Sequence, residues 1–135
     1  MTIKQDIRHG RHCVFEIYVH LVFVTKCRRG VLTEDMIHSL NPVFAKVCSD
    51  FEADLIECNG EDDHVHLLLK YPPKVALSKL VNSLKGVSSR LLQKDFPQIQ
   101  DKLWGNALWS GSYFAASCGG APLEKVRTYI EEQRN

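Results

Sequence analysis

Two histidines, His64 and His66, stand one residue apart in a run of apolar residues. The run is typical of a β-strand, in which successive side chains point to opposite faces of a sheet, so both imidazoles share one face. Two neutral imidazoles at this spacing make half of a metal site, and the acidic residues just before them, Glu61-Asp62-Asp63, favour a bound cation. Polar histidines on a solvated sheet face are an equally plain explanation, so the metal hypothesis depends on a partner elsewhere in the chain.

The C-terminal segment Tyr129-Ile130-Glu131-Glu132-Gln133 is the candidate partner of this pair. Tyr129 and Gln133 are four residues apart and therefore neighbours on one flank of a helix, at the edge of an apolar stripe. A single tyrosine at such a border is more often a structural residue with its hydroxyl in water. Tyr129 therefore indicates a functional site only in combination with the two histidines.

The elements that must position these residues follow from the hydrophobic pattern. Period-two patterns and turn residues predict strands over residues 13–24, 53–59, 64–71 and 108–118. Helical spacing predicts one helix with Thr33 as its N-cap, in which Pro42 should cause a kink or a split, a second helix over residues 77–95, and a short final helix that starts at Pro122. The order is that of an α+β, ferredoxin-like fold (split βαβ, RRM-like): an antiparallel sheet with helices on one face, plus the tyrosine-bearing C-terminal helix.

A single domain is expected for the 135 residues, with a polar N-terminal arm over residues 1–12 and the tyrosine helix over residues 120–135. Hydrophobic residues make up 44% and charged residues 24%, typical of an ordinary globular protein, and no apolar run is long enough to span a membrane. Five cysteines without a CxxC pair indicate neither a zinc knuckle nor a disulfide framework, and the arm lacks a signal-peptide pattern, so we expect a cytoplasmic protein. A net charge of +1 leaves only local basic clusters for binding a polyanion.

The sequence resembles the single-tyrosine HUH transposases of bacterial and archaeal insertion sequences, enzymes that move elements as single-stranded DNA. The resemblance covers nearly the whole chain and rests on five segments that occur in the family's order. They are His20-Leu21-Val22-Phe23-Val24-Thr25-Lys26-Cys27-Arg28-Arg29, Asp63-His64-Val65-His66-Leu67-Leu68-Leu69, Leu84-Lys85-Gly86-Val87-Ser88-Ser89-Arg90, Leu108-Trp109-Ser110-Gly111-Ser112-Tyr113-Phe114 and Tyr129-Ile130-Glu131-Glu132-Gln133.

This resemblance implies roles for the residues of the site. His64 and His66 match the two histidines of the HUH motif, Gln133 matches the third ligand of a divalent metal ion, Mg²⁺ or Mn²⁺, and Tyr129 matches the nucleophile. Attack by the tyrosine on a scissile phosphate would give a 5′-phosphotyrosine bond and a free 3′-hydroxyl, and the strand transfer that follows needs no nucleotide cofactor. The phenol, whose pKa is about 10 when free, needs activation by the metal or by a base that the sequence does not identify.

The resemblance also implies partners: single-stranded DNA with subterminal hairpins, and a second copy of the chain in a homodimer in which the tyrosine helix can dock on the partner's histidine strand to give shared active sites. Whether the tyrosine helix docks on its own sheet or on that of the partner is left open by the sequence. The best candidates for the DNA surface are basic residues after the first strand and on the second helix, although each alone is equally typical of a solvated surface. They are Lys26, Arg28, Arg29, Lys79, Lys85 and Arg90.

Two alternatives stay open at this point. A domesticated HUH nuclease that cuts repeat hairpins without transposing would keep the same residues. An RRM-like module that binds single strands without catalysis would share the fold, but the RNP signature is missing. A histidine-triad hydrolase is disfavoured, because the position for its third alternate histidine is Leu68.

Overall fold

A computed structural model of the chain describes residues 8–9, 14–15, 17–26, 30–103, 105–117 and 123–133. The central order is strand, helix, strand, strand, helix, strand, followed by a final helix, which confirms the predicted α+β, ferredoxin-like fold. The elements are β1 (Arg8–His9), β2 (Val14–Phe15), β3 (Tyr18–Val24), α1 (Glu34–Asp50), β4 (Asp54–Glu61), β5 (His64–Lys70), α2 (Leu77–Asp95), the 3₁₀ helix η1 (Pro97–Lys102), β6 (Phe114–Ser117) and α3 (Leu123–Gln133).

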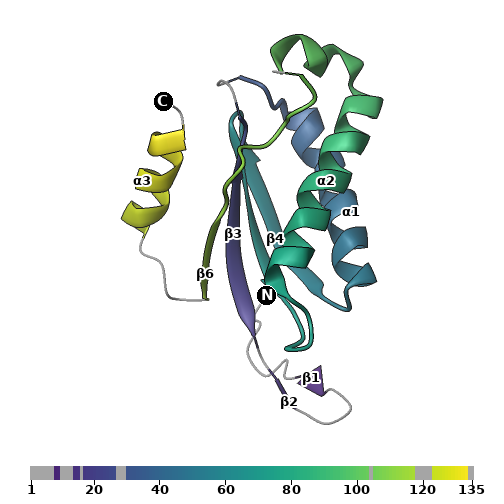
Figure 1. Cartoon of the computed structure of the whole chain (residues 1–135), viewed down its shortest axis with the longest axis vertical. Helices are drawn as coiled ribbons and strands as arrows, with labels where there is room; N and C mark the ends of the chain where they lie inside the picture. Colours follow the sequence, from purple (N-terminus) through teal and green to yellow (C-terminus); the bar gives the residue numbers. More distant parts are fainter. Residues whose placement is uncertain are drawn as a thin grey trace.

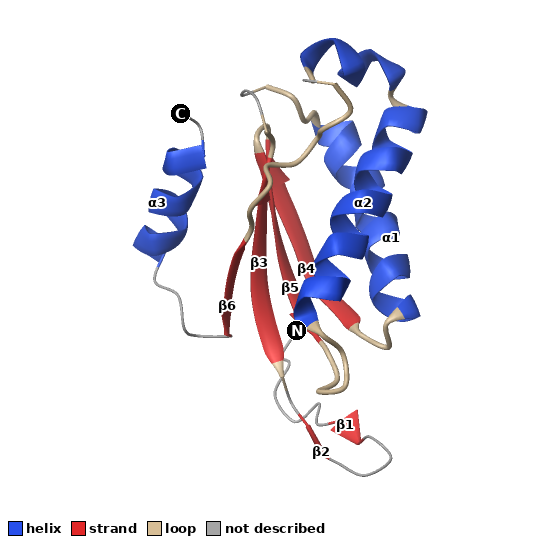
Figure 2. Ribbon diagram, in the orientation of Figure 1, coloured by secondary structure: helices blue, strands red, loops and turns tan. Residues whose placement is uncertain are grey.

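The main sheet has four strands in the order β4-β5-β3-β6, each antiparallel to its neighbour. Helices α1 and α2 lie on one side of the sheet and α3 lies on the other (Figure 1). Figure 2 shows that β3 is a central strand while β6 forms the edge closest to α3. The sheet is therefore covered by two helices on one face, and on the other face by α3 near β3 and β6.

Alternation along the strands sorts their side chains between the two faces. Leu21 and Phe23 of β3 are fully buried on the face toward α1, where the ring of Phe23 meets that of Phe44 edge-on at 6.2 Å between centroids. Val22 and Val24 point to the other face and pack with Ile130 of α3. The two hydrophobic clusters thus hold helices on opposite sides of one sheet.

Helix α1 begins at the predicted N-cap, where the Thr33 hydroxyl accepts a hydrogen bond from the backbone N–H of Met36 at 3.2 Å. Pro42 lies inside this helix, yet the helix continues to Asp50, so the expected split is wrong. A proline removes one backbone hydrogen bond, and the buried stripe of the helix, which includes Leu40 and Phe44 on either side of the proline, outweighs that loss.

The predicted first strand is shorter than expected. Its start pairs separately as the β1–β2 hairpin, with Arg8 opposite Phe15, and the strand of the main sheet begins only at Tyr18. Ile17 still accepts a hydrogen bond from the backbone N–H of Tyr71 at 3.1 Å, just before β3.

The predicted fourth strand is also divided. Trp109 forms an isolated bridge with Thr25, and regular pairing resumes only at Phe114. The loop between these points, Ser110 to Tyr113, contacts α3. In the part of the chain that the structure describes, no helix is both long and apolar enough to cross a membrane.

Candidate active site

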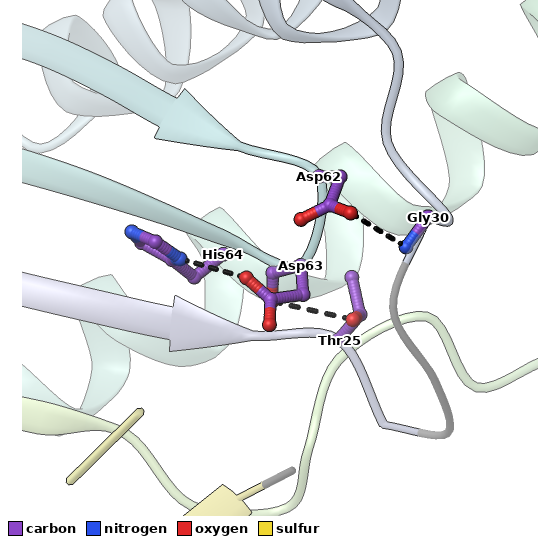
Figure 3. A network of polar contacts seen from close by, with 5 residues as sticks. All are labelled: Thr25, Gly30, Asp62, Asp63 and His64. Carbon is purple, nitrogen blue, oxygen red and sulfur yellow. Dashed lines mark hydrogen bonds and ion pairs between the residues drawn. The ribbon is translucent and has the colours of Figure 1, made fainter. Parts of the chain in front are cut away.

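His64 opens strand β5 and is oriented by the turn before it. Its Nδ1 lies 2.9 Å from Oδ1 of Asp63, a carboxylate that is 1% exposed. Figure 3 shows this pair together with Thr25, whose backbone N–H and hydroxyl both donate to the carbonyl of Asp63, at 2.9 and 3.2 Å. A ring N–H on Nδ1 that donates to the carboxylate leaves the Nε2 lone pair for another ligand, the usual outer partner of a metal-binding histidine.

The other acidic residue of the turn, Asp62, has a structural role. Its Oδ2 accepts a hydrogen bond from the backbone N–H of Gly30 at 3.1 Å, as Figure 3 also shows, and its carbonyl accepts one from Leu32 at 2.9 Å. The turn is thereby tied to the segment that leads into α1. Two neighbouring carboxylates therefore do different work, one on the imidazole and one on the backbone.

His66 shares its face with His64 but has a different partner. Its Nε2 lies 3.0 Å from Nδ1 of His20 on β3, and the two rings stack at 5.1 Å between centroids with an interplanar angle of 7°. Burial lowers the pKa of His66, and the neighbouring His20 and His64 lower it further, against an opposing effect of Glu57. The neutral imidazole, which is the form that binds a metal ion, is therefore favoured.

His20 was not among the candidate residues of the sequence analysis. Alternation along β3 could have indicated His20, because it places this residue on the same face as Val22 and Val24, which is the face of the histidines. The diagonal contact of His20 with His66 depends in addition on the register of β3 against β5. That register, with Val22 opposite His66 and Leu68 opposite His20, is a tertiary property.

Tyr129 and Gln133 belong to α3, which lies on the side of the sheet opposite α1 and α2 (Figure 1) and packs on Val22 and Val24. Val22 and Val24 lie opposite His66 and His64 in the sheet, so α3 shares the face of the histidines. The ring of Tyr129 packs against Phe114 at 5.6 Å between centroids, and its hydroxyl lies 2.8 Å from Oγ of Ser112. Burial raises the pKa of Tyr129, and the hydrogen bond with Ser112 opposes that rise in part. The phenol is thus neutral and held by a serine, without a hydrogen bond to either histidine.

Gln133 is held in the same way. Its Oε1 accepts a hydrogen bond from Oγ of Ser110 at 2.9 Å, with Oγ of Ser112 at 3.5 Å. The backbone N–H of Ser110 in turn donates to the carbonyl of Val24 at 2.7 Å, and Val24 is the residue opposite His64 in the sheet. The backbone of Ser110, whose side chain holds Gln133, therefore lies two strand spacings, roughly 10 Å, from the backbone of His64.

The basic candidates for the DNA surface differ in their surroundings. Lys26, Lys79 and Arg90 are exposed, whereas Lys85 is half-buried and its Nζ donates to the carbonyls of Ser110 at 2.6 Å and Ser112 at 3.2 Å. Burial lowers the pKa of Lys85. Arg28 and Arg29 lie outside the described residues.

The donors of the site are consistent in kind with a site for a divalent metal ion. Among the described residues, no three or more histidine, cysteine, aspartate or glutamate side chains form a group that could hold one. The expected set is instead two imidazoles and one amide oxygen, which suits a divalent ion that keeps several positions open. The Asp63–His64 hydrogen bond and the lowered pKa of His66 fit this chemistry, while Nε2 of His66 is engaged with His20 and Oε1 of Gln133 with Ser110.

Known proteins are similar to this chain over most of its length. The family described as "Transposase IS200 like" matches residues 13–133. The ISDra2 transposase TnpA of Deinococcus radiodurans is 31% identical over 135 residues, which cover 100% of this chain and 96% of that protein. The transposase for insertion sequence element IS200 of Salmonella typhimurium is 28% identical over 134 residues, covering 98% and 85%.

Two solved structures are similar to this one. A crystal structure of a candidate transposase from Deinococcus radiodurans R1 has a TM-score of 0.83 and 29% identity, over 93% of this chain and 97% of that one. A REP-associated tyrosine transposase bound to a REP hairpin has a TM-score of 0.56 and 13% identity, over 92% and 68%, which shows a shared fold only. The chain therefore belongs to the family of IS200-like transposases, enzymes that act on DNA.

Proposed function

We propose that the chain acts as one domain, residues 1–135, which is a metal-dependent single-stranded DNA endonuclease and strand transferase of DNA transposition. The observation that supports this most directly is the placement of α3. It brings Tyr129 and Gln133 to the face of the sheet that carries His64 and His66. A nucleophile, a polar amide and two imidazoles on one face are the groups that metal-assisted phosphoryl transfer needs.

The proposed reaction exchanges one phosphodiester for another. The phenol oxygen of Tyr129 attacks the scissile phosphorus, the bond from phosphorus to the 3′-oxygen of the upstream strand breaks, and the 5′-phosphate of the downstream strand becomes linked to the tyrosine. The phenol gives up its proton, and the departing 3′-oxygen takes one up. Because the phosphodiester energy is kept, a different 3′-hydroxyl can reverse the step and join two strands.

Nε2 of His64, a ring nitrogen of His66 and Oε1 of Gln133 would hold Mg²⁺ or Mn²⁺. Such an ion, when bound, polarises the phosphate as a Lewis acid and helps to neutralise the charge that develops in the transition state. Asp63 keeps the lone pair of His64 directed outward by accepting from its Nδ1. Gln133 must exchange its bond with Ser110 for the metal, or share its second lone pair.

The proposed partners are single-stranded DNA with subterminal hairpins and a second copy of the chain. One relative with this fold is bound to a REP hairpin. The exposed cations Lys26, Lys79 and Arg90, together with Arg28 and Arg29, are the proposed phosphate contacts. Because the hydrophobic contact of α3 with the sheet rests on a small cluster around Ile130, the same helix could dock on the partner, so we propose a homodimer with shared sites in the cytoplasm.

A test uses single-stranded DNA that carries a hairpin and a 3′ extension, incubated with the protein and Mn²⁺ or Mg²⁺. A protein–DNA adduct that survives denaturant, and that a chelator prevents, is expected. A shift of the DNA in a native gel that is insensitive to the chelator, without any adduct, would instead indicate the RRM-like binding module and refute the proposal.

A hairpin nuclease without transposition is the second candidate. The similarity in fold to the REP-associated protein favours it, whereas the 31% identity to the ISDra2 transposase over nearly the whole of both chains favours transposition. An assay with two cleavable ends separates the two functions. A transposase should produce a joined product from the two ends, whereas the nuclease should only cut.

A further inference from the structure

The segment that joins η1 to β6 lies at the edge of the sheet, where Trp109 pairs with Thr25, and it contacts α2 on one side and α3 on the other. Three side chains of α2 hold it on the first side. Nε2 of Gln93 donates to the carbonyl of Asn106 at 3.1 Å, and Nε1 of Trp109 donates to the hydroxyl of Ser88 at 3.0 Å. Lys85 makes the third attachment, at the end of the loop closest to the histidines.

The ammonium group of Lys85 is used within the protein. Its ammonium donates to the carbonyls of Ser110 and Ser112, so two of its three N–H groups are used within the protein. Lys79 on the same helix is exposed by comparison. A lysine already committed to two carbonyls is a poor phosphate contact and a good structural tie.

The same two serines face α3 with their side chains. The hydroxyl of Ser112 bonds to the phenol oxygen of Tyr129 at 2.8 Å, and that of Ser110 donates to the amide oxygen of Gln133 at 2.9 Å. Each serine therefore joins Lys85 through its carbonyl to α3 through its hydroxyl. These polar contacts fall on the two residues of α3 to which the proposed function gives a role.

We propose that Lys85 is a positioning residue: through Ser110 and Ser112 it sets where Tyr129 and Gln133 stand. It acts on α3 from the opposite face of the sheet and does not touch the DNA. The effect of Lys85 on the position of α3 does not depend on the proposed function, whereas its effect on DNA cleavage rests on that function. The inference reassigns Lys85 from the basic surface to the support of the site.

The first test measures amide hydrogen exchange in α3 of the DNA-free protein. Lys85→Met keeps the aliphatic stem and removes the ammonium, so exchange in residues 123–133 should quicken by roughly fivefold. Lys46→Met is the matched control, because Lys46 is an exposed lysine on α1 that pairs only with Asp50 among the described residues. It should leave exchange in α3 as in the unchanged protein.

The double variant Ser110→Ala and Ser112→Ala provides a second route to the same result. It leaves α2 and the carbonyl contacts of Lys85 in place, so it remains informative if Lys85→Met does not fold. Faster exchange in α3 in both variants, or in the serine variant where Lys85→Met does not fold, supports the proposal. Unchanged exchange in α3 in a folded Lys85→Met protein, or in the serine variant, overturns it.

The second test separates positioning from phosphate binding. In Lys85→Met the rate of adduct formation at saturating DNA should fall at least tenfold, while the Kd for DNA and its salt dependence stay within about twofold. Lys79→Met should show the opposite pattern, with a weaker Kd and a smaller salt slope. A weaker Kd and a smaller salt slope in Lys85→Met, with an unchanged saturated rate, would overturn the inference. If the unchanged protein forms no adduct, the proposed function fails, and hydrogen exchange still decides the role of Lys85.

Discussion

Asp63→Asn should weaken the binding of Mn²⁺ without unfolding the protein. The substitution keeps the shape of a side chain that is 1% exposed and removes the charge that accepts from Nδ1 of His64 at 2.9 Å. A neutral amide makes the imidazole less basic. If it turns its NH₂ toward Nδ1, it also forces the proton onto Nε2, the atom that must bind the metal.

The size of this effect follows from the position of the carboxylate. Loss of an outer-shell partner of a metal-binding histidine costs about 10- to 100-fold in affinity, which is about 1.4–2.7 kcal/mol. Asp62→Asn is the control, since this neighbouring carboxylate bonds to the backbone of Gly30 and not to an imidazole. It removes the same charge from the same turn, so it measures the general electrostatic contribution alone.

The assay is a titration of the DNA-free protein with Mn²⁺, followed by electron paramagnetic resonance of the free ion. We expect a tenfold or larger rise in Kd for Asp63→Asn and a change within about twofold for Asp62→Asn. Equal Kd values for Asp63→Asn and the unchanged protein would refute the reasoning. An equal loss of affinity for Mn²⁺ in both variants would mean that Asp63 acts only through its negative charge and not through its hydrogen bond to His64.

Three further predictions concern the scaffold. Phe44→Ala removes a fully buried ring that contacts the sheet and should lower the free energy of unfolding by about 3–5 kcal/mol, measured by urea denaturation. Gly60→Ala would place a Cβ 2.9 Å from the backbone oxygen of His64, so it should cost about 1–3 kcal/mol in the same measurement. Burial raises the pKa of Cys48 to about 12 and that of Cys58 to about 11. Both thiols should therefore react with iodoacetamide at pH 9 far more slowly in the folded protein than in urea, as measured for each cysteine by mass spectrometry. Because the folded-state pKa values are raised, the two thiols contribute fully to the free energy of unfolding below pH 9, and this contribution should be lost as the pH rises toward 12.

Local sequence signals predicted the helices of this fold well and the ends of its strands less well. The apolar stripe of α2 gave its limits, Leu77 and Asp95, and Thr33 marked the start of α1. Pro42 was overrated as a helix breaker, because tertiary packing decides whether one missing hydrogen bond matters. The interruption of the predicted fourth strand between Trp109 and Phe114 arises from contacts with α2 that local propensity does not encode.

The site was predictable in its residue types and less so in its contacts. Alternation along β5 is enough to place His64 and His66 on one face, and the structure agrees. The pairing of His20 with His66, and the hold of the serines on Tyr129, need the register of three strands and the docking of a helix far away in sequence. For Lys85 the sequence shows only a basic residue on a helix, whereas its hydrogen bonds to the carbonyls of Ser110 and Ser112 depend on the fold.

The central claim is that Tyr129 is the nucleophile, and the most direct test is to map the covalent link. The adduct formed with hairpin-bearing single-stranded DNA and Mn²⁺ is digested, and its tyrosine peptides are sequenced by mass spectrometry. We predict a phosphodiester on Tyr129, no adduct in Tyr129→Phe, and at least a hundredfold slower formation in His64→Ala. An adduct that persists in Tyr129→Phe, or that maps to Tyr113, would contradict the account.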